Sequence, residues 1–560
     1  MGNNEIAKHF SLLSQLMEVH GENSFKSKTY SITAFRIEQL TVELQTLSPE
    51  QIFSINGIGD SIGKKILEVT GTGKMKILEE LLSKTPEGIL EIMKIKGVGP
   101  KKISIIWKEL NVENIGELLY ACHENRLSLL KGFGKKTQEN VIESIEFFLN
   151  QKGNYLYAQV EQLAMDVEKL LNKIFSSDKI KITGSFARQN ETVEELEFVI
   201  PFPDKIISGK MEAIPGFTLL ENTDQHFLYK YNEGIKIKLY IADEISLQQK
   251  IFETGGSPEF IKSFYERFPG MEIKNAPDEE AIFTTAGLQY IPHYLREHAS
   301  IIDLATEKKL PGVIQPWDIR GIIHCHSNWS DGSDTLEELA TACVARGYEY
   351  LVISDHSKSA IYAQGLSEEK IKAQHSLVDE LNSKLTPFKI FKSIESDILN
   401  DGSLDYTNNV LSTFDLVIAS IHSNLKMPEE KATMRLLNAI ANPYTTILGH
   451  LTGRLLLSRK GYPVDHKKII DACAANNVVI EINAHPRRLD MRWQWLEYAL
   501  SKNVIVSIDP DSHSITEFDN TKYGVLVAQK GLVSAKKNLS SFTLREFEIF
   551  LKENKKKKNL

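Results

Sequence analysis

The sequence predicts a multidomain protein with a helical N-terminal region, an α+β middle region and a C-terminal array of parallel strands that alternate with helices. Its 560 residues are enough for about three or four domains of ordinary size. Residues 1–150 carry apolar residues at helical spacing, whereas residues 179–241 contain runs of alternating polar and apolar residues. Beyond a linker with two prolines and a glycine, apolar strands alternate with helical patterns, which is typical of a parallel βα array.

The composition limits the classes of function that are open. Hydrophobic residues make up 42% of the chain, charged residues 25%, and the net charge is −8. These values are typical of a globular protein, and a local basic patch can still exist within an acidic average. No apolar run approaches the roughly 18 residues of a membrane span, and the start of the chain lacks a secretory pattern. Four scattered cysteines indicate neither a disulfide framework nor a CxxC zinc site. We therefore expect a reduced, cytoplasmic, monomeric protein without a membrane partner.

The helical region, residues 1–150, contains an imperfect repeat of a short glycine loop. Its copies are Ile55–Gly59, Ile95–Gly99 and Lys131–Gly134, and each is followed by two lysines before or within a new helical pattern. A Gly-x-Gly turn permits positive φ and presents unpaired N–H groups, which attract phosphate oxygens at the start of a helix. One copy would be explained by a tight turn, but three copies resemble tandem helix-hairpin-helix motifs and predict binding to the DNA backbone without sequence reading. The candidate contacts are Gly57, Gly59, Lys64, Gly97, Gly99, Lys101, Lys102, Gly132 and Gly134.

The middle region, residues 155–310, reads as a half-buried sheet with helices. A strand over residues 179–183 ends in the turn Gly184–Ser185, and Glu195 and Glu197 alternate with apolar residues on the next strand. The stretch from Gly184 to Glu197 resembles the palm of the family X DNA polymerases, which belong to the nucleotidyltransferase superfamily. In that family the Gly-Ser turn holds the triphosphate, and two aspartates one residue apart bind Mg²⁺ together with a third carboxylate.

The palm resemblance is incomplete at the residues that would carry polymerisation. Glu195 and Glu197 stand at the two aspartate positions, and the third carboxylate position falls on Lys238. Because Mg²⁺ demands near-ideal octahedral placement, we expect a palm fold whose polymerase activity is degenerate. Lys65 aligns with a lysine that forms a Schiff base with abasic sugar in some members of the family. A phosphate contact is the alternative role of Lys65.

The C-terminal region, residues 317–545, carries polar residues where its strands end. We predict seven strands: 319–323, 350–354, 388–394, 416–421, 445–448, 478–482 and 504–508. The residues at or just beyond their ends include His324, His326, Asp355, His356, Glu395, His422, His450, Asn483, His485, Asp511 and His513. In βα barrels these ends share one face. Imidazoles with carboxylates favour Zn²⁺, Mn²⁺ or iron, and this many donors is enough for two or three ions, which would support phosphoester hydrolysis.

The same strand ends resemble the polymerase-and-histidinol-phosphatase (PHP) domain, a distorted (βα)7 barrel. The resemblance implies nine metal ligands: His324, His326, Asp331, His356, Glu395, His422, His450, Asp511 and His513. The order of the three regions resembles that of the bacterial family X polymerases that carry a PHP nuclease. In that family the PHP domain removes 3′-terminal nucleotides and processes abasic or blocked ends, typically with Mn²⁺.

The sequence therefore predicts a DNA-binding, metal-dependent phosphodiesterase of DNA repair, associated with the bacterial nucleoid. Arg454 and Arg487 or Arg488 follow strand ends and could hold a phosphate, with a salt bridge as the alternative. Residues 546–560 form a basic tail that we expect to be a frayed end. Two other functions remain open, namely an active gap-filling polymerase with a PHP exonuclease and a phosphatase of a small phosphomonoester.

Overall fold

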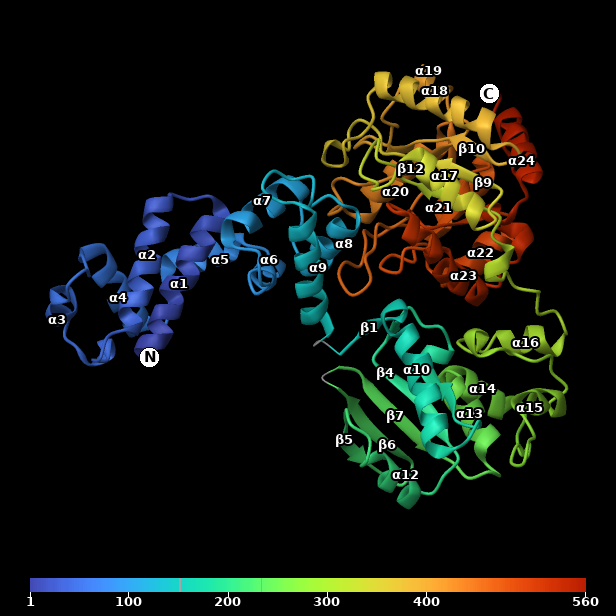
Figure 1. The fold of residues 1–560 in the computed structure, drawn as a ribbon, viewed down its shortest axis with the longest axis horizontal. Helices are drawn as coiled ribbons and strands as arrows, with labels where there is room; N and C mark the ends of the chain where they lie inside the picture. The colour runs from blue at the N-terminus through green and yellow to red at the C-terminus, as the bar shows by residue number, and fades with distance from the viewer. Residues whose placement is uncertain (151–152, 233) are drawn as a thin grey trace. The chain divides into compact units, whose positions relative to one another are not determined.

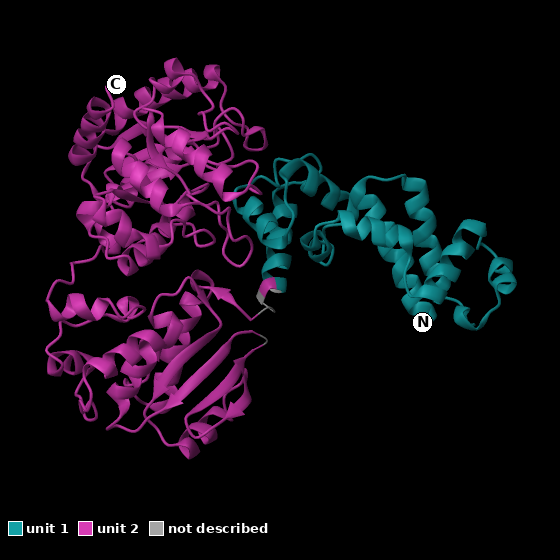
Figure 2. Cartoon of the chain, turned by 180° about the vertical axis from the view of Figure 1, so that it is seen from behind, with its two compact units in different colours: residues 1–148 teal, residues 149–560 magenta. Residues whose placement is uncertain are grey.

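Residues 1–150, 153–232 and 234–560 are described in a computed structural model of the chain (Figure 1). The chain divides into two compact units, Met1–Phe148 and Leu149–Leu560 (Figure 2). The predicted junction between the helical and middle regions includes residues 151 and 152, which lie outside the described residues. The three predicted kinds of structure, helical, α+β and parallel βα, follow one another along the chain in the predicted order.

The first unit is built from helices. They are α1 (Asn3–His20), α2 (Ser24–Glu38), α3 (Pro49–Ser54), α4 (Asp60–Thr72), α5 (Lys76–Lys84), α6 (Glu87–Ile92), α7 (Pro100–Leu110), α8 (Ile115–His123) and α9 (Lys135–Asn150). Phe10, Leu13 and Met17 on α1 are buried in one hydrophobic core, as their helical spacing predicts. Each glycine loop ends where a helix begins, because α4 follows Gly59, α7 follows Gly99 and α9 follows Gly134.

The middle region contains a five-stranded sheet in the order β2-β4-β7-β6-β5. The strands are β2 (Lys181–Thr183), β4 (Glu195–Ile200), β5 (Phe217–Asn222), β6 (His226–Tyr231) and β7 (Lys236–Ile241). Strands β4 and β7 are parallel, and their register places Glu197 opposite Lys238. Helix α10 (Tyr157–Phe175) packs Val160, Val167 and Leu171 into the same core as Leu196 and Phe198.

A second core of the middle region lies among shorter helices. These are α13 (Leu247–Gly255), α14 (Pro258–Arg267), α15 (Glu279–Thr285) and α16 (Ile301–Thr306). Their aromatic residues Phe252, Phe264 and Phe283 pack in edge-to-face arrangements, which aromatic rings prefer over face-to-face stacking.

The C-terminal region is a barrel of parallel strands in two arcs, β10-β9-β8 and β11-β12-β13-β14-β15. The strands are β8 (Gly321–Cys325), β9 (Tyr350–Ile353), β10 (Lys389–Lys392), β11 (Glu395–Asp397), β12 (Val417–Ser420), β13 (Thr445–Leu448), β14 (Val479–Asn483) and β15 (Val506–Asp509). Single bridges between Cys325 and Ser512 and between His356 and Glu395 join the arcs on both sides. The predicted third strand, 388–394, is therefore β10 alone, and Glu395 opens a separate strand, β11, instead of ending β10.

Helices follow the strands of the barrel. They are α17 (Leu336–Ala345), α18 (Glu368–Leu385), α20 (Glu429–Ala441), α21 (His466–Asn476), α22 (Leu496–Ser501) and α23 (Thr521–Lys530). A membrane-spanning helix is not found among residues 1–150, 153–232 and 234–560. The basic tail differs from expectation, because it belongs to α24 (Leu544–Lys557) and is not frayed. Phe547 and Leu551 of this helix are buried, and Lys555 Nζ donates to the carbonyl of Phe414 at 2.8 Å, so packing outweighs the local charge repulsion.

Candidate functional site

The nine side chains that the PHP resemblance implies as ligands meet at the carboxyl ends of the barrel strands. Eight of them fall into three overlapping groups whose donor atoms lie within 4.8 Å of one another. The groups are His326, Asp331, His356 and His513; His324, His326 and Asp511; and His356, Glu395 and His422. The ninth, His450, joins through Glu395, since its Nε2 lies 2.9 Å from Glu395 Oε1. We call these nine residues the cluster.

Glu395 lies at the centre of the cluster. Its Oε1 is 3.3 Å from His324 Nε2 and 3.2 Å from His422 Nε2, and its Oε2 is 3.0 Å from His356 Nδ1. Asp511 Oδ1 has a similar position between His324 Nε2, at 3.4 Å, and His326 Nε2, at 3.1 Å. Glu395 therefore lies between imidazoles from three different strands, whereas the two imidazoles beside Asp511 both come from β8 and its end.

The arrangement fits divalent metal ions. His324 Nε2, His356 Nδ1 and Glu395 Oε2 are buried and form no hydrogen bond within the described ranges, although they approach oppositely charged groups closely. Burial alone would lower the pKa of His324, but the carboxylates of Glu481, Asp511 and Glu395 raise it well above its ordinary value. Burial would likewise raise the pKa of Glu395, but nearby imidazoles hold it well below its ordinary value. Protons thus balance the carboxylates when no metal is bound, and metal ions would replace those protons.

The backbone at two cluster residues lies in the left-handed region, which side chains other than glycine rarely adopt. His324 has φ of 61° and Asp511 has φ of 51°. The pairing of β8 with β9 is irregular at the same place, between Ile322 and Cys325. His324 and His326 both reach Asp511, and the irregular end of β8 brings them there, since regular alternation is interrupted at this place. Strained backbone of this kind is concentrated at functional sites.

Sequence reasoning missed Glu481, which supports three parts of the cluster from β14. Its side chain is fully buried. Glu481 Oε2 lies 2.5 Å from His324 Nδ1, and Oε1 accepts hydrogen bonds from the backbone N–H of His450 and from Asn483 Nδ2, each at 2.9 Å. Asn483 Nδ2 also donates to Asp511 Oδ2 at 3.1 Å. An acid within the apolar strand Val478–Ile482 was the available signal. Carboxylates in this position fix the tautomer and orientation of a ligating imidazole.

We expect Glu481→Gln to weaken Mn²⁺ binding by about 10- to 100-fold, since outer carboxylates contribute that much to metal affinity. Isothermal titration of the metal-free protein with Mn²⁺ measures the change. Glu497→Gln is the matched control, because Glu497 lies on α22, outside the groups that could hold a metal. Equal Mn²⁺ affinity in Glu481→Gln and the control would show that Glu481 does not support the cluster.

Asp355 comes directly before His356 in the segment that follows β9. Instead of holding His356, it accepts hydrogen bonds from the backbone N–H of Ser327 at 2.8 Å and from Gln374 Nε2 at 2.6 Å. Asp355 therefore holds the loop that leads from His326 to Asp331. Asp397 has the orienting role at His422, since its carboxylate is hydrogen-bonded to Nδ1 of that ring.

The arginines that follow strand ends differ in their surroundings. The buried Arg454 forms an ion pair with Glu191 of the middle region at 2.6 Å, as the salt-bridge alternative expects, and phosphate binding by Arg454 stays a prediction. Of the two arginines that follow β14, Arg488 approaches the cluster, with its Nε 3.7 Å from Asp511 Oδ2. Arg487 is also buried, and its backbone N–H donates to His485 Nδ1 at 3.2 Å.

The two glutamates of the palm-like sheet are engaged with other side chains. Lys238 Nζ lies 3.1 Å from Glu195 Oε1, and the hydroxyl of Tyr240 donates to Glu197 Oε1 at 2.9 Å. The other oxygen of Glu197 accepts from the backbone N–H of Ser185 at 2.9 Å, in the Gly184–Ser185 turn that would hold a triphosphate. These contacts leave a magnesium ion poorly accommodated. All the groups of three or more side chains that could hold a metal ion lie in the barrel. Among the described residues of the middle region, 153–232 and 234–310, no such group is found.

The glycine loops of the first unit have the backbone that the repeat predicts. Gly57, Gly97 and Gly132 have φ of 86°, 87° and 88°, which favours glycine at each position. Gly59 and Gly99 are the N-cap residues of α4 and α7, and no side chain caps the first N–H groups of these helices. Gly134 directly precedes α9.

The lysines beside these loops differ in exposure. Lys64 and Lys101 are exposed, whereas Lys65 and Lys102 are half-buried. Lys65 Nζ donates to Ser61 Oγ at 3.5 Å, and Lys102 Nζ lies 5.4 Å from the centre of the Phe133 ring. Exposed lysines beside unpaired N–H groups are suited to phosphate contact. The Schiff-base role of Lys65 stays a prediction.

Models of known protein domains match three ranges of this chain. A helix-hairpin-helix domain model matches residues 1–75, and a model of a SAM-like helix-hairpin-helix tandem matches residues 89–146. The PHP domain model matches residues 323–485, and Asp511 and His513 lie beyond its end. These matches support DNA binding by the first unit and metal-dependent chemistry in the barrel.

Relatives extend the comparison to the whole chain. A Bacillus subtilis protein named DNA polymerase/3′-5′ exonuclease PolX is 32% identical over 99% of this chain and 100% of its own length. A probable phosphatase of Caldanaerobacter subterraneus is 29% identical, but the match covers 27% of this chain and 56% of the relative. A probable phosphatase of Clostridium acetobutylicum is 32% identical over 26% of this chain and 64% of the relative.

The full-length match joins the helix-hairpin-helix loops, the palm-like sheet and the PHP barrel in one protein of common descent. The chain belongs to the bacterial family X DNA polymerases that carry a C-terminal PHP domain.

Proposed function

We propose that this chain is a metal-dependent phosphodiesterase that removes nucleotides from the 3′ ends of DNA during repair. The observation that carries the proposal is the cluster, in which three overlapping groups of imidazoles and carboxylates, all buried except the half-buried His422, share members. Shared members suit adjacent metal ions, and Mn²⁺ or Zn²⁺ matches the mixed nitrogen and oxygen donors. When bound, such ions act as Lewis acids and make water a nucleophile near neutral pH.

The chain's own residues would divide the remaining work. Glu395 and Asp511 would balance the charge of the imidazoles around them, a role that their short distances to His324 support. Arg488 brings a positive charge beside Asp511, where it could hold a phosphate oxygen of the substrate. Glu481 and Asp397 fix the rings of His324 and His422. The nine ligand assignments, and this role for Arg488, are part of the proposal.

DNA is the proposed substrate because the helix-hairpin-helix loops offer backbone N–H groups and lysines to a phosphate backbone. Contacts of this kind carry no sequence information, so we expect binding that depends on salt concentration more than on sequence. The name of the Bacillus subtilis relative includes a 3′-5′ exonuclease, which agrees with this substrate.

We further propose that the palm-like domain does not polymerise. Lys238 faces Glu195, and Glu197 fills the turn that would bind a triphosphate, so the residues present do not fit a magnesium-dependent polymerase. The domain would then serve as a scaffold in a family X framework.

We expect the full-length protein to shorten 3′ ends of single-stranded or gapped DNA when Mn²⁺ is present and to stop when the metal is removed. The substrates are 5′-labelled oligonucleotides with defined 3′ ends. The protein is first stripped of metal with a chelator, and Mn²⁺ or Zn²⁺ is then added back. Metal analysis measures how much of each ion the protein binds. In a parallel primer-extension reaction with deoxynucleotides, we expect no product that is longer than the primer.

Two outcomes would support the other functions. Primer extension that disappears in Glu195→Gln would show an active polymerase. Fast turnover of a small phosphomonoester, without cleavage of DNA, would show a phosphatase and overturn the proposal.

A further inference from the structure

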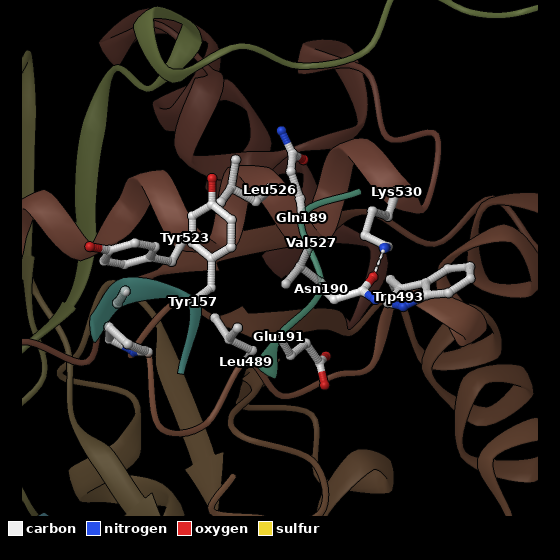
Figure 3. Close-up of a pocket in the computed structure, with 12 residues that line it drawn as sticks. Tyr157, Gln189, Asn190, Glu191, Leu489, Trp493, Tyr523, Leu526, Val527 and Lys530 are labelled. Atoms are coloured by element: carbon white, nitrogen blue, oxygen red, sulfur yellow. Dashed lines mark hydrogen bonds between the residues drawn. The ribbon is translucent and has the colours of Figure 1, made fainter. Parts of the chain in front are cut away.

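A turn of the palm-like domain, Gln189–Glu191, packs against the barrel. It lines a small pocket together with Pro486 and Leu489 of the barrel loop that carries Arg487 and Arg488 (Figure 3). Lys530, the last residue of α23, donates from Nζ to Asn190 Oδ1 at 2.8 Å and to the carbonyl of Arg188 at 2.7 Å. Its side chain is only 2% exposed. A buried charge of this kind persists only where its partners are fixed, so this contact holds the two domains in one arrangement.

Glu191 is the acid of this turn, and both its oxygens bind Arg454 of the barrel. Arg454 Nη2 lies 2.6 Å from Oε1 and Nη1 lies 3.0 Å from Oε2, a bidentate geometry that fixes the guanidinium plane. The guanidinium also donates to the carbonyl of Leu489. The side chain of Arg454 is 2% exposed and that of Glu191 is 21% exposed, so water competes poorly for the pair.

Arg454 lies between two loops that reach the cluster. The first loop begins at His450, whose carbonyl accepts from the backbone N–H of Gly453 at 2.9 Å. The second loop contains Arg488, beside Asp511, and ends at Leu489, whose carbonyl Arg454 holds. A further bond joins the loops directly, from the backbone N–H of Leu456 to the carbonyl of Arg487 at 2.6 Å. One buried arginine therefore sets the relative position of a cluster ligand and a neighbouring cation.

We propose that Glu191 of the palm-like domain is a positioning residue for the metal cluster of the barrel and acts through Arg454. Without its carboxylate the guanidinium is left buried and unbalanced, and it must move toward water or draw in another anion. Either movement shifts Leu489 and the loop from His450. The inference rests on the proposed nuclease function, and it gives a degenerate palm a role in the chemistry of the neighbouring domain.

The test compares Glu191→Gln, Arg454→Met and the double variant in the full-length protein. Glutamine keeps the shape of Glu191 but removes its charge, and methionine keeps apolar volume without leaving a buried charge. Glu161→Gln is the matched control. Glu161 also joins the palm-like domain to the barrel, through Lys522 Nζ at 2.7 Å and the hydroxyl of Tyr523 at 3.0 Å, but both partners lie on α23, which carries no cluster residue.

Two quantities are compared below the unfolding temperature of every variant, and KM is determined alongside them. They are the dissociation constant of Mn²⁺ from calorimetry of the stripped protein, and kcat for 3′ shortening of DNA at saturating Mn²⁺. We expect Glu191→Gln to weaken Mn²⁺ binding and lower kcat by about tenfold each, with KM nearly unchanged, while Glu161→Gln matches the wild type. Adding Glu191→Gln to Arg454→Met should change either quantity less than twofold, because the two residues act as one unit.

The outcomes separate the two proposals. Wild-type protein that binds Mn²⁺ but leaves DNA intact would overturn the nuclease, while the Mn²⁺ titration would still test the positioning role. An active wild type with Glu191→Gln equal to Glu161→Gln in both quantities would overturn the positioning role alone. A full additional loss from Glu191→Gln in the Arg454→Met background would show that Glu191 does not act through Arg454.

Discussion

Glu395→Gln is expected to lower the rate of 3′ shortening of DNA by about three orders of magnitude or more, which is the scale on which key electrostatic groups act. The carboxylate of Glu395 lies within 3.3 Å of His324 and within 3.0 Å of His356, and it also contacts His422 and His450. Glutamine has nearly the same shape but removes the negative charge that balances these imidazoles. We therefore expect Glu395→Gln to bind fewer metal ions than the wild type. His324→Ala should likewise bind fewer metal ions and shorten DNA more slowly.

The measurement for this prediction combines the nuclease assay with metal analysis and DNA binding. Binding to single-stranded DNA should persist in both variants, since the glycine loops lie in a separate compact unit. Asp415→Asn is the matched control, because this half-buried barrel acid lies just before β12, at the opposite end of the strands, and accepts from the backbone N–H of Lys392 at 2.8 Å. Cleavage at the wild-type rate in His324→Ala or Glu395→Gln would refute the assignment of the cluster.

Glu279→Ala is expected to destabilise the middle region by about 3–5 kcal/mol, because it leaves a buried charge without its partner. Arg296 is fully buried, and its Nη1 donates to Glu279 Oε1 at 2.6 Å. The guanidinium also lies 4.9 Å from the centre of the Phe283 ring, so it cannot reach water without breaking the aromatic core. Glu280→Ala, at the adjacent exposed position, should change stability by less than about 0.5 kcal/mol.

The same pair makes the stability of this region depend on pH. Burial would raise the pKa of Glu279, but the hydrogen bond from His293 and the charge of Arg296 outweigh burial and keep it below its ordinary value of 4.5. A carboxyl whose pKa is lower in the folded state binds fewer protons there, so its contribution is present above pH 4.5 and is lost as the pH falls through the folded pKa. Hydrogen exchange of residues 279–305 against pH should show this loss in the wild type and a flatter profile in Glu279→Ala. Equal profiles would rule out the pair as the cause.

The prediction of the fold succeeded where a local pattern was enough. Helical spacing in residues 1–150, alternation around Glu195 and the apolar strands of the barrel all depend on which face of an element is buried. The bulge at His324 and the separate strand β11 were not predictable, because they depend on how β8 and β11 pair with neighbours distant in the sequence. The last helix was missed for a similar reason, since a run of lysines indicates solvent unless the apolar face beneath it is known.

The sequence by itself determined which residue types stand at the ends of the barrel strands, and parallel strands then bring them to one face. It also determined the positive φ of the glycine loops, because that preference belongs to the residue itself. Only the tertiary structure decided that Glu481 supports His324, that Lys238 faces Glu195 and that Arg454 binds Glu191. Each of these pairs joins side chains whose distance depends on strand register or on the packing of two domains, and no local pattern of residues specifies either.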